Sequence, residues 1–401
     1  MRVYIRTYGC KVNQVESEEL AARFVALGHE LVDDEALAQL YVVNGCTVTG
    51  EADAKVRKGV RRAALLPRVE EVLVTGCAAE LRADELKALS DKVVILTRAS
   101  ATSLSPLPAE PLSFHTRAPV KVQDGCENFC AYCVVPYARG ASRSEALATL
   151  TGRVAALVAR GTREVVLTGV NIGRYRDPDT GADLVGLIRA LHERTGVCRI
   201  RLSSIEPPDV TEELCELLAQ GILCEHLHIP LQSGSDAVLK AMGRRYTTAE
   251  FAAAAARVRA AAPQTAISTD VIVGYPTETD ADFEATYDFC RAQSFSKIHV
   301  FRFSPRAGTP AAQLTPWQPP LIAARAARLR ALSADLADSY ARAQVGRTLQ
   351  WVVERRDPAT GQATLTSREH LSMRISAADY ATGELCSLPF DMMKSAGDNI
   401  G

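Results

Sequence analysis

Short apolar runs alternate with amphipathic stretches over the first hundred residues. The apolar runs that predict strands are Val3–Thr7, Leu40–Asn44 and Glu71–Thr75. The amphipathic stretches that predict helices are Ser17–Leu27, which ends at Gly28, and Glu51–Leu66, which Pro67 stops. Alternating β and α units predict a parallel sheet covered by helices, so we expect a Rossmann-like α/β domain over residues 1–100.

A second βα series follows a stretch rich in Ser and Pro at residues 100–118, which is typical of an interdomain linker. Helical patterns such as Glu145–Arg160 and Phe251–Ala262 separate its strands. Six right-handed βα units predict a partial (βα)6 barrel over residues 116–335. The six predicted strands are Pro119–Gln123, Glu164–Leu167, Arg199–Leu202, His226–Pro230, Ile267–Val273 and Lys297–Phe303.

The end of the chain has a different pattern. A break at Trp317–Pro320 precedes a predicted helix at Leu321–Arg342. Short strand-like segments follow it, and they predict a small β-barrel domain over residues 340–401. These segments are Leu349–Glu354, Ala363–Ser367 and Leu371–Ile375.

Composition adds limits on where the protein works and what it binds. The formal net charge is -1, so any nucleic-acid-binding face has to be local. No segment is long and apolar enough to span a membrane, and the beginning of the sequence does not resemble a signal peptide. We therefore expect a cytoplasmic protein, in which the 11 cysteines are metal ligands, catalytic groups or buried apolar residues rather than disulfides.

Three cysteines form a CxxxCxxC motif at Cys126, Cys130 and Cys133, directly after the first barrel strand. Three thiolates at this spacing can hold three irons of a 4Fe–4S cluster and leave the fourth iron open to a cofactor. Structural zinc sites normally have four ligands, and no fourth Cys or His lies nearby in sequence. The motif predicts a cluster that binds S-adenosylmethionine (SAM), with Tyr132 placed to pack against it; three unliganded buried cysteines are the alternative.

A second set of cysteines follows the three strands of the first domain. Cys10, Cys46 and Cys77 each come just past a strand and after a glycine, which allows close backbone approach. Because the carboxyl ends of parallel strands share one edge, these cysteines should converge. We predict a second 4Fe–4S cluster there, with zinc as the main alternative and buried structural cysteines as the other.

Polar and Gly-rich motifs follow the later barrel strands, where the active site of a parallel barrel lies. They begin at Thr168, Ser203, Leu231, Val273 and Ser304. We expect several of their residues to contact SAM: Gly169, Asn171, Ser204, Glu206 and Gln232. His226 and His228 alternate along one strand, and we interpret them as packed or solvated residues rather than as a site.

Across essentially its whole length, the chain resembles the methylthiotransferase family of radical SAM enzymes. The Gly-Cys contexts resemble the family's N-terminal domain, the six-strand region its radical SAM core, and the tail a TRAM domain, which binds RNA. Gly9-Cys10-Lys11-Val12-Asn13-Gln14 and Tyr132–Gly140 resemble the enzymes that act on N6-threonylcarbamoyladenosine in tRNA. The sequence departs from the family at Phe301–Ser304, where Pro-Tyr is more usual before the Ser, and in its tail, where seven basic and seven acidic residues from Ala341 onward balance.

The resemblance implies a reaction and its partners. The first cluster binds SAM and the second holds the sulfur that is added to C2 of the adenine, at position 37 in the anticodon stem-loop of tRNA, while a second SAM supplies the methyl group. An external electron donor, such as flavodoxin or ferredoxin, and a sulfur donor are required. The alternatives are a methylthiotransferase for isopentenyladenosine tRNA, one for a ribosomal protein aspartate, and a non-catalytic iron–sulfur RNA-binding regulator.

Two further regions are candidates for substrate contact. The helix after Cys46 is rich in Lys and Arg, and Lys58 and Arg62 share one of its faces. These residues either bind RNA phosphates or form a solvated helix face. The carboxylate of a threonylcarbamoyl group needs a polar partner, for which Arg302 is a candidate, with an ordinary salt bridge as the alternative. Arg139 and Arg143 are further candidates that could instead serve SAM or the cluster.

Overall fold

The structure is a computed structural model that describes residues 1–102, 113–376 and 379–394. These residues form two units. The first contains residues 1–102 and 113–114, together with 124–143 and 306–309; the second contains residues 115–123, 144–305, 310–376 and 379–394. The CxxxCxxC loop therefore groups with the N-terminal sheet. The predicted linker falls largely on residues 103–112, outside the described part of the chain.

The first unit is built on a parallel sheet with strand order β2-β1-β3-β4-β5. Its strands are β1 (Arg2–Tyr8), β2 (Glu30–Leu31), β3 (Leu40–Gly45), β4 (Glu71–Thr75) and β5 (Val93–Ile95). Its helices are α1 (Lys11–Ala26), α2 (Gly50–Ala64), α3 (Cys77–Leu81), α4 (Ala83–Lys87), α5 (Arg98–Thr102) and α6 (Val135–Arg139). The predicted parallel α/β domain is confirmed.

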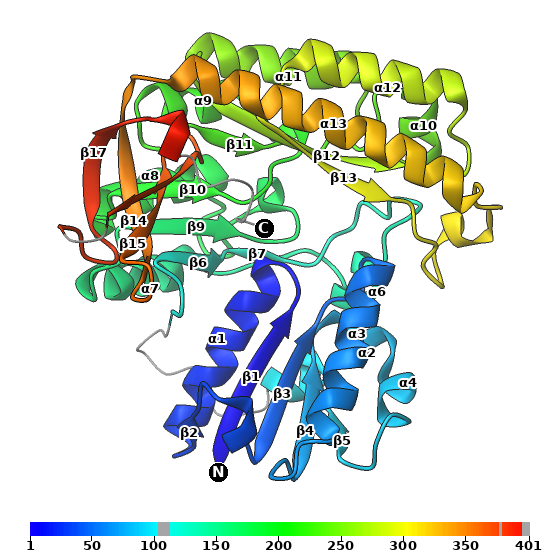
Figure 1. The fold of residues 1–401 in the computed structure, drawn as a ribbon, viewed down its shortest axis with the longest axis vertical. Coiled ribbons are helices and arrows are strands. Elements are labelled where there is room, and N and C mark those ends of the chain that lie inside the picture. Colours follow the sequence, from blue (N-terminus) through cyan, green and yellow to red (C-terminus); the bar gives the residue numbers. More distant parts are fainter. Residues whose placement is uncertain (103–112, 377–378, 395–401) are drawn as a thin grey trace. The chain divides into compact units, whose positions relative to one another are not determined.

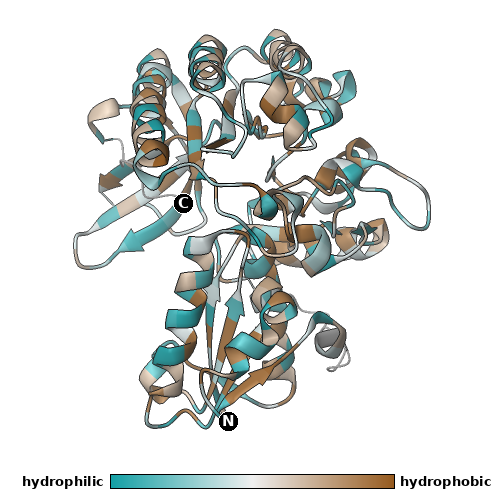
Figure 2. Ribbon diagram, turned by 90° about the vertical axis from the view of Figure 1, so that its right-hand side faces the viewer, coloured by the Kyte–Doolittle hydropathy of each residue, from teal (hydrophilic) through white to brown (hydrophobic). Residues whose placement is uncertain are grey.

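Alternation along the strands gives this sheet two apolar faces. Val42 and Leu73 pack with α1, whereas Val43 and Val74 pack with α2. Figure 1 shows α1 on one side of the sheet and α2 on the other, and Figure 2 shows hydrophobic residues concentrated in the strands.

Helix α1 begins at Lys11, six residues before the predicted start at Ser17. Cys10 occupies its N-cap, and the Asn13 side chain accepts a hydrogen bond from the Cys10 backbone N–H at 3.2 Å. The first turns bury Val12 and Val15 together with polar Asn13, so their buried face is not purely apolar and hydrophobic periodicity marks it only weakly.

The second unit contains six parallel strands in two ladders, β10-β9-β6 and β11-β12-β13. A bridge between Ile200 and Leu223 continues the first ladder toward the second. The strands are β6 (Arg117–Lys121), β9 (Glu164–Thr168), β10 (Arg199–Leu202), β11 (His226–His228), β12 (Ala266–Val273) and β13 (Lys297–Arg302). The predicted six-stranded parallel arrangement is confirmed, with boundaries within about two residues for all six strands.

Helices cover the outer face of these strands, as Figure 1 shows for α11, α12 and α13. One apolar core unites the helices with outward-pointing strand residues such as Leu227, Val271 and Ile298. The helices are α7 (Leu147–Ala159), α8 (Leu184–Thr195), α9 (Glu212–Ala219), α10 (Asp236–Ala241), α11 (Thr248–Ala261), α12 (Asp280–Gln293) and α13 (Pro319–Gln344). Pro319 and Pro320 open α13 rather than break the chain, because proline fits the first helical turn.

The tail forms a four-stranded antiparallel sheet with the order β16-β15-β14-β17. Its strands are β14 (Thr348–Asp357), β15 (Gln362–Ser367), β16 (Ser372–Ser376) and β17 (Leu385–Pro389). A buried ion cluster joins it to the barrel: Glu164 pairs with Arg199 at 2.7 Å and with Arg201 at 2.6 Å. Arg201 also donates to the backbone carbonyl of Ser367 at 3.0 Å, so the tail sheet is tied to the start of the barrel strands.

The short strands β7 (Gln123–Asp124) and β8 (Arg143–Ser144) lie where the chain enters and leaves the CxxxCxxC loop. None of the helices in the described ranges is both long and apolar enough to cross a lipid bilayer.

Candidate functional site

The first set of cysteines lies at one edge of the N-terminal sheet. Cys10 follows β1, Cys46 follows β3, and Cys77 follows β4 and begins α3. The three strands are direct neighbours, so their carboxyl ends bring the thiols together. Cys10 and Cys77 are close enough to influence the ionisation of Cys46 electrostatically.

A network of amides and glycines holds the backbone of this edge. The Nδ2 of Asn13 donates to the Oδ1 of Asn44 at 2.9 Å, and Asn44 donates to the backbone carbonyl of Asn13 at 2.9 Å. Gly76 has a φ of +82°, and a Cβ there would lie 2.4 Å from the Oδ1 of Asn44. A Cβ at Gly9 would lie 2.3 Å from the Oδ1 of Asn13. Two of the Gly-Cys pairs thus permit close packing beside the cysteines.

The CxxxCxxC loop belongs to the same unit and is folded on itself. The N–H of Cys126 donates to the carbonyl of Gly140 at 3.1 Å, and the N–H of Cys133 donates to the carbonyl of Cys130 at 2.9 Å. Phe129 has a φ of +48°, a conformation that non-glycine residues rarely adopt and that is often found at functional sites. Tyr132 is half-buried.

Arg139 links this segment to the first set of cysteines. It lies six residues after Cys133, is almost fully buried, and its Nε donates to the Sγ of Cys77 at 3.2 Å. Its Nη1 pairs with Glu16 and with Asp124, each at 2.9 Å. Burial raises the pKa of the Cys77 thiol, whereas the Arg139 cation lowers it.

Each set supplies three thiols, none of which is in a disulfide. Thiolates are ligands of both zinc and iron–sulfur clusters, and a closed structural zinc site normally has four ligands. Three thiols therefore suit a centre that keeps one position open.

Burial raises the pKa of the Cys46 thiol to about 12. Since iron binds the thiolate, metal binding at this set must release protons.

Two predicted SAM contacts lie on the loop after β9. The side chain of Gln123 accepts hydrogen bonds from the N–H groups of Val170 and Asn171 at 3.0 and 2.8 Å. A Cβ at Gly169 would lie 2.7 Å from the carbonyl of Gln123, so the loop packs tightly there. The Oδ1 of Asn171 is buried and has no hydrogen-bond partner in the described residues, which leaves it available to a ligand donor.

The other predicted SAM contacts follow β10 and β11. Glu206 forms an ion pair with Arg244, so its charge is already compensated. Ser204 is half-buried on the same loop. Gln232 has a φ of +68°, and its backbone N–H donates to the carbonyl of Asp270 at 2.8 Å. A non-glycine residue keeps such a positive φ only where neighbouring contacts fix its backbone, so the backbone of Gln232 is held in place.

The motif at Ser304–Thr309, unlike the other strand-end motifs, has most of its residues in the first unit. Arg306 pairs with Asp53 at 2.6 Å and donates to the carbonyl of Thr47 at 3.0 Å. Residues 306–309 thus belong to the first unit, and Arg306 is held by groups next to Cys46.

The basic residues of α2 divide into two groups. Lys55, Lys58 and Arg61 are exposed and form no ion pair with the described residues. Arg62, although exposed, pairs with Glu35. Arg302 is exposed at the end of β13, and it alternates with Phe301 along that strand.

Sequence reasoning missed two features. It offered Arg139 as a contact for the substrate, SAM or a cluster, but it did not identify Cys77 as its partner, and it did not group the histidines of neighbouring strands. The sequence signal for Arg139 is its place in Tyr132–Gly140, a segment that resembles the family. The registers of β11, β12 and β13, which bring the histidines together, are not readable from local sequence.

Comparison with known proteins supports the fold. Residues 120–290 match the Radical SAM superfamily, and residues 2–97 match the uncharacterized protein family UPF0004. Among solved structures, the radical SAM methyltransferase TsrM from Kitasatospora setae superposes with a TM-score of 0.54 at 13% identity, covering 78% of this chain and 75% of that chain.

Relatives in sequence cover most of the chain. The threonylcarbamoyladenosine tRNA methylthiotransferase MtaB of Thermotoga maritima is 39% identical over 336 residues, which span 78% of this chain and 77% of the relative. MtaB of Bacillus subtilis is 36% identical over 381 residues, spanning 88% and 84%. The tRNA-2-methylthio-N(6)-dimethylallyladenosine synthase of Cereibacter sphaeroides is 35% identical over 390 residues, spanning 90% and 89%. With this similarity and the radical SAM fold, the chain belongs to the radical SAM methylthiotransferase family.

Proposed function

We propose that this enzyme converts N6-threonylcarbamoyladenosine at position 37 of tRNA to its 2-methylthio derivative. The observation that carries the proposal is the 39% identity to MtaB of Thermotoga maritima over most of both chains. Similarity to the dimethylallyladenosine synthases at 35% makes an isopentenyl-type adenosine the second candidate substrate.

Cys126, Cys130 and Cys133 hold the 4Fe–4S cluster that the family requires, and SAM binds there. When bound, this cluster and SAM supply the radical chemistry of the reaction. Among the residues of the barrel, Asn171 offers its unpartnered Oδ1 to a donor group of SAM, such as the amino group. Gly169, Ser204, Glu206 and Gln232 are further proposed contacts, although the ion pair with Arg244 leaves Glu206 better suited to positioning than to direct binding.

Cys10, Cys46 and Cys77 hold a second 4Fe–4S cluster in this proposal, at which the transferred sulfur is bound. The three thiols, which follow neighbouring parallel strands of one sheet, support this assignment. Arg139 supports it as well, because a guanidinium beside Cys77 favours the charged thiolate that an iron ligand must be.

The exposed face of α2 is the proposed contact for RNA phosphates. Lys58 and Arg61 are the residues best suited to bind phosphates, because Arg62 already pairs with Glu35. Arg302 remains a proposed contact for the threonylcarbamoyl carboxylate, since it is exposed at the carboxyl end of a barrel strand, where active sites of such barrels lie. The enzyme also needs an external electron donor and a sulfur donor, and we place it in the cytoplasm with its tRNA.

Competition between two purified tRNAs tests the choice of substrate. One carries N6-threonylcarbamoyladenosine and the other N6-isopentenyladenosine beside the anticodon. Reconstituted enzyme with reductant, a sulfide source and SAM should methylthiolate the first at least tenfold faster. An Arg302→Ala variant should narrow this preference, and an Arg68→Ala variant should not. Preference of the wild-type enzyme for the isopentenyl tRNA would overturn the substrate assignment and leave the chemistry standing.

A further inference from the structure

Four of the seven histidines gather in the second unit, on and beside strands β11 and β13. The rings of His226 and His370 stack with their centroids 4.4 Å apart, and the rings of His228 and His299 meet edge-on at 5.6 Å. None of these histidines is a member of either set of cysteines, and the proposed reaction assigns them no role.

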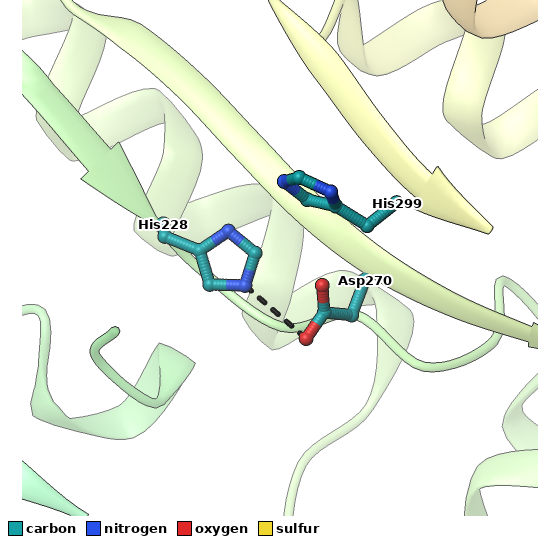
Figure 3. A group of neighbouring side chains, drawn as sticks. All are labelled: His228, Asp270 and His299. Carbon is teal, nitrogen blue, oxygen red and sulfur yellow. Dashed lines mark ion pairs between the residues drawn. The ribbon is translucent and has the colours of Figure 1, made fainter. Parts of the chain in front are cut away.

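Strand register brings His228, Asp270 and His299 to the same face. Asp270 pairs in register with His299, and Ser268 pairs with His228. Val271 and Ile298, the chain neighbours of Asp270 and His299, point into the helix-covered core. Because side chains alternate along a strand, the three side chains of the group point to the opposite face. Figure 3 shows the three side chains converging from three neighbouring strands.

The distances within this group are those of a metal-binding set. The Nε2 of His228 lies 3.2 Å from the Oδ2 of Asp270, and one ligand atom from each of the three residues lies within 4.8 Å of the others. Two ligands that each lie about 2.1 Å from one ion are about 3.0–3.4 Å apart in octahedral or tetrahedral geometry. The first pair already meets this separation, and a ring nitrogen of His299 lies within 4.8 Å of both partners.

The donors have the chemistry of a particular class of metal. Two imidazole nitrogens and one carboxylate oxygen form the protein part of many zinc and non-haem iron sites, in which further positions stay open. Each of the three residues is half-buried, which leaves room for water or an anionic group on the ion. The site therefore resembles an open site more than a closed structural one.

A second layer of contacts orients His228. Its Nδ1 meets the Oγ of Ser268 at 3.0 Å, and the same hydroxyl meets the Nε2 of His226 at 3.1 Å. Engaging Nδ1 leaves Nε2 directed at Asp270, which is the arrangement that metal-bound histidines usually have.

The charge of Asp270 gives a further reason for a cation. In the described part of the chain, its ion-pair partner is His228, and no lysine or arginine pairs with it. A neutral imidazole leaves the carboxylate charge uncompensated, whereas a divalent cation would compensate it. We propose that His228, Asp270 and His299 bind a divalent metal ion of the zinc class, with Ser268 holding His228 in place.

Zinc binding to the cluster-loaded, full-length enzyme tests this proposal under anaerobic conditions. Calorimetric titration with Zn²⁺ and metal analysis after desalting should give one zinc per chain in addition to the cluster iron. X-ray absorption at the zinc edge should show nitrogen and oxygen ligands at about 2.0–2.2 Å and no sulfur at about 2.3 Å. This readout separates the site from any zinc held by cysteines.

Near-isosteric variants provide the controls. Asp270→Asn and His299→Gln should each weaken zinc binding at least tenfold, and Ser268→Ala should weaken it about tenfold through loss of orientation. His192→Ala, which removes an exposed histidine on α8, should bind as the wild type does. Circular dichroism and the cluster absorption verify that each variant is folded. Failure of the wild type to bind zinc, a sulfur shell at the zinc edge, or unchanged affinity in both ligand variants would overturn the proposal.

Discussion

At the scale of single residues, Arg139 is a buried charge with three partners. Its guanidinium lies against the Cys77 thiol and two carboxylates, and its side chain is 2% exposed. Removing one member of such a buried set leaves the others uncompensated, which typically costs about 3–5 kcal/mol.

We therefore predict that Arg139→Gln lowers the iron content held by Cys10, Cys46 and Cys77 and shifts the reduction potential of that cluster downward. Arg139→Lys should give an iron content and a reduction potential between those of Arg139→Gln and the wild type. Lysine keeps the positive charge but lacks the planar guanidinium that can bind several partners at once. Iron analysis and redox titration followed by electron paramagnetic resonance measure both effects. Arg68→Gln, at an exposed position, is the control; a normal potential and iron content in Arg139→Gln would show that the contact is only structural.

Glu18 carries a second residue-scale prediction. Burial raises the pKa of its carboxyl to about 7, although hydrogen bonds from the Phe114 N–H at 2.7 Å and from Ser113 lower it. The folded protein thus holds this proton more tightly than the unfolded chain, and stability falls as pH rises from about 4.5 to about 7.

Glu18→Gln should remove this part of the pH dependence. Between about pH 5 and pH 8, the wild type should lose up to about 2.5 kcal/mol more unfolding free energy than the variant does. Urea denaturation at both pH values measures it, with the exposed Asp91→Asn as the control. Parallel pH profiles for Glu18→Gln and the wild type would contradict the burial argument.

At the scale of elements, most strands could be predicted because their cause is local. The strand at Glu71–Thr75 matches in full, since a buried strand between two helix layers is a continuous apolar run. The start of α1 could not be predicted, because Cys10 takes the place of the usual N-cap residue and polar Asn13 is buried between Val12 and Val15. The convergence of Cys10, Cys46 and Cys77 was predictable from strand topology, whereas the histidine cluster depends on register between strands far apart in sequence.

Helix α2 gives a prediction at this scale. Changing Lys58 and Arg61 together to Glu should weaken tRNA binding at least tenfold and reduce the slope of log K against log salt by about 1–2, because about two phosphate contacts are lost. Filter binding at several salt concentrations measures both. Arg68→Glu combined with Lys87→Glu, both at exposed positions, controls for the same change in net charge. An unchanged affinity of the double variant for tRNA would show that this face of α2 is exposed to solvent and does not bind RNA.

At the scale of the whole molecule, we propose that each of the two sets of cysteines holds one 4Fe–4S cluster with its own role in the reaction. Anaerobically reconstituted wild type should hold about eight irons, as two cubes of four. Replacing Cys126, Cys130 and Cys133 with Ala should leave about four irons and abolish SAM cleavage. Replacing Cys10, Cys46 and Cys77 should also leave about four, with SAM cleavage retained and sulfur insertion lost. Eight irons in the second triple variant would refute the assignment of the second cluster.

The fold class and family were accessible from sequence because the cysteine spacing and the βα series extend over most of the chain. The grouping of residues 124–143 with the N-terminal sheet was not, since it depends on contacts such as Arg139 with Cys77. Sequence order places that loop in the barrel, but the buried charges of Glu16 and Asp124 hold it in the first unit.

We propose that this enzyme adds a methylthio group to N6-threonylcarbamoyladenosine in tRNA. The direct test is mass spectrometry of tRNA nucleosides from cells with the gene, without it, and complemented by the Cys10→Ala or Cys126→Ala variant. We predict that the 2-methylthio derivative disappears on deletion, that N6-threonylcarbamoyladenosine accumulates, and that only the wild-type gene restores the product. Unchanged 2-methylthio-N6-threonylcarbamoyladenosine after deletion, or loss of the 2-methylthio isopentenyl nucleoside instead, would contradict the account.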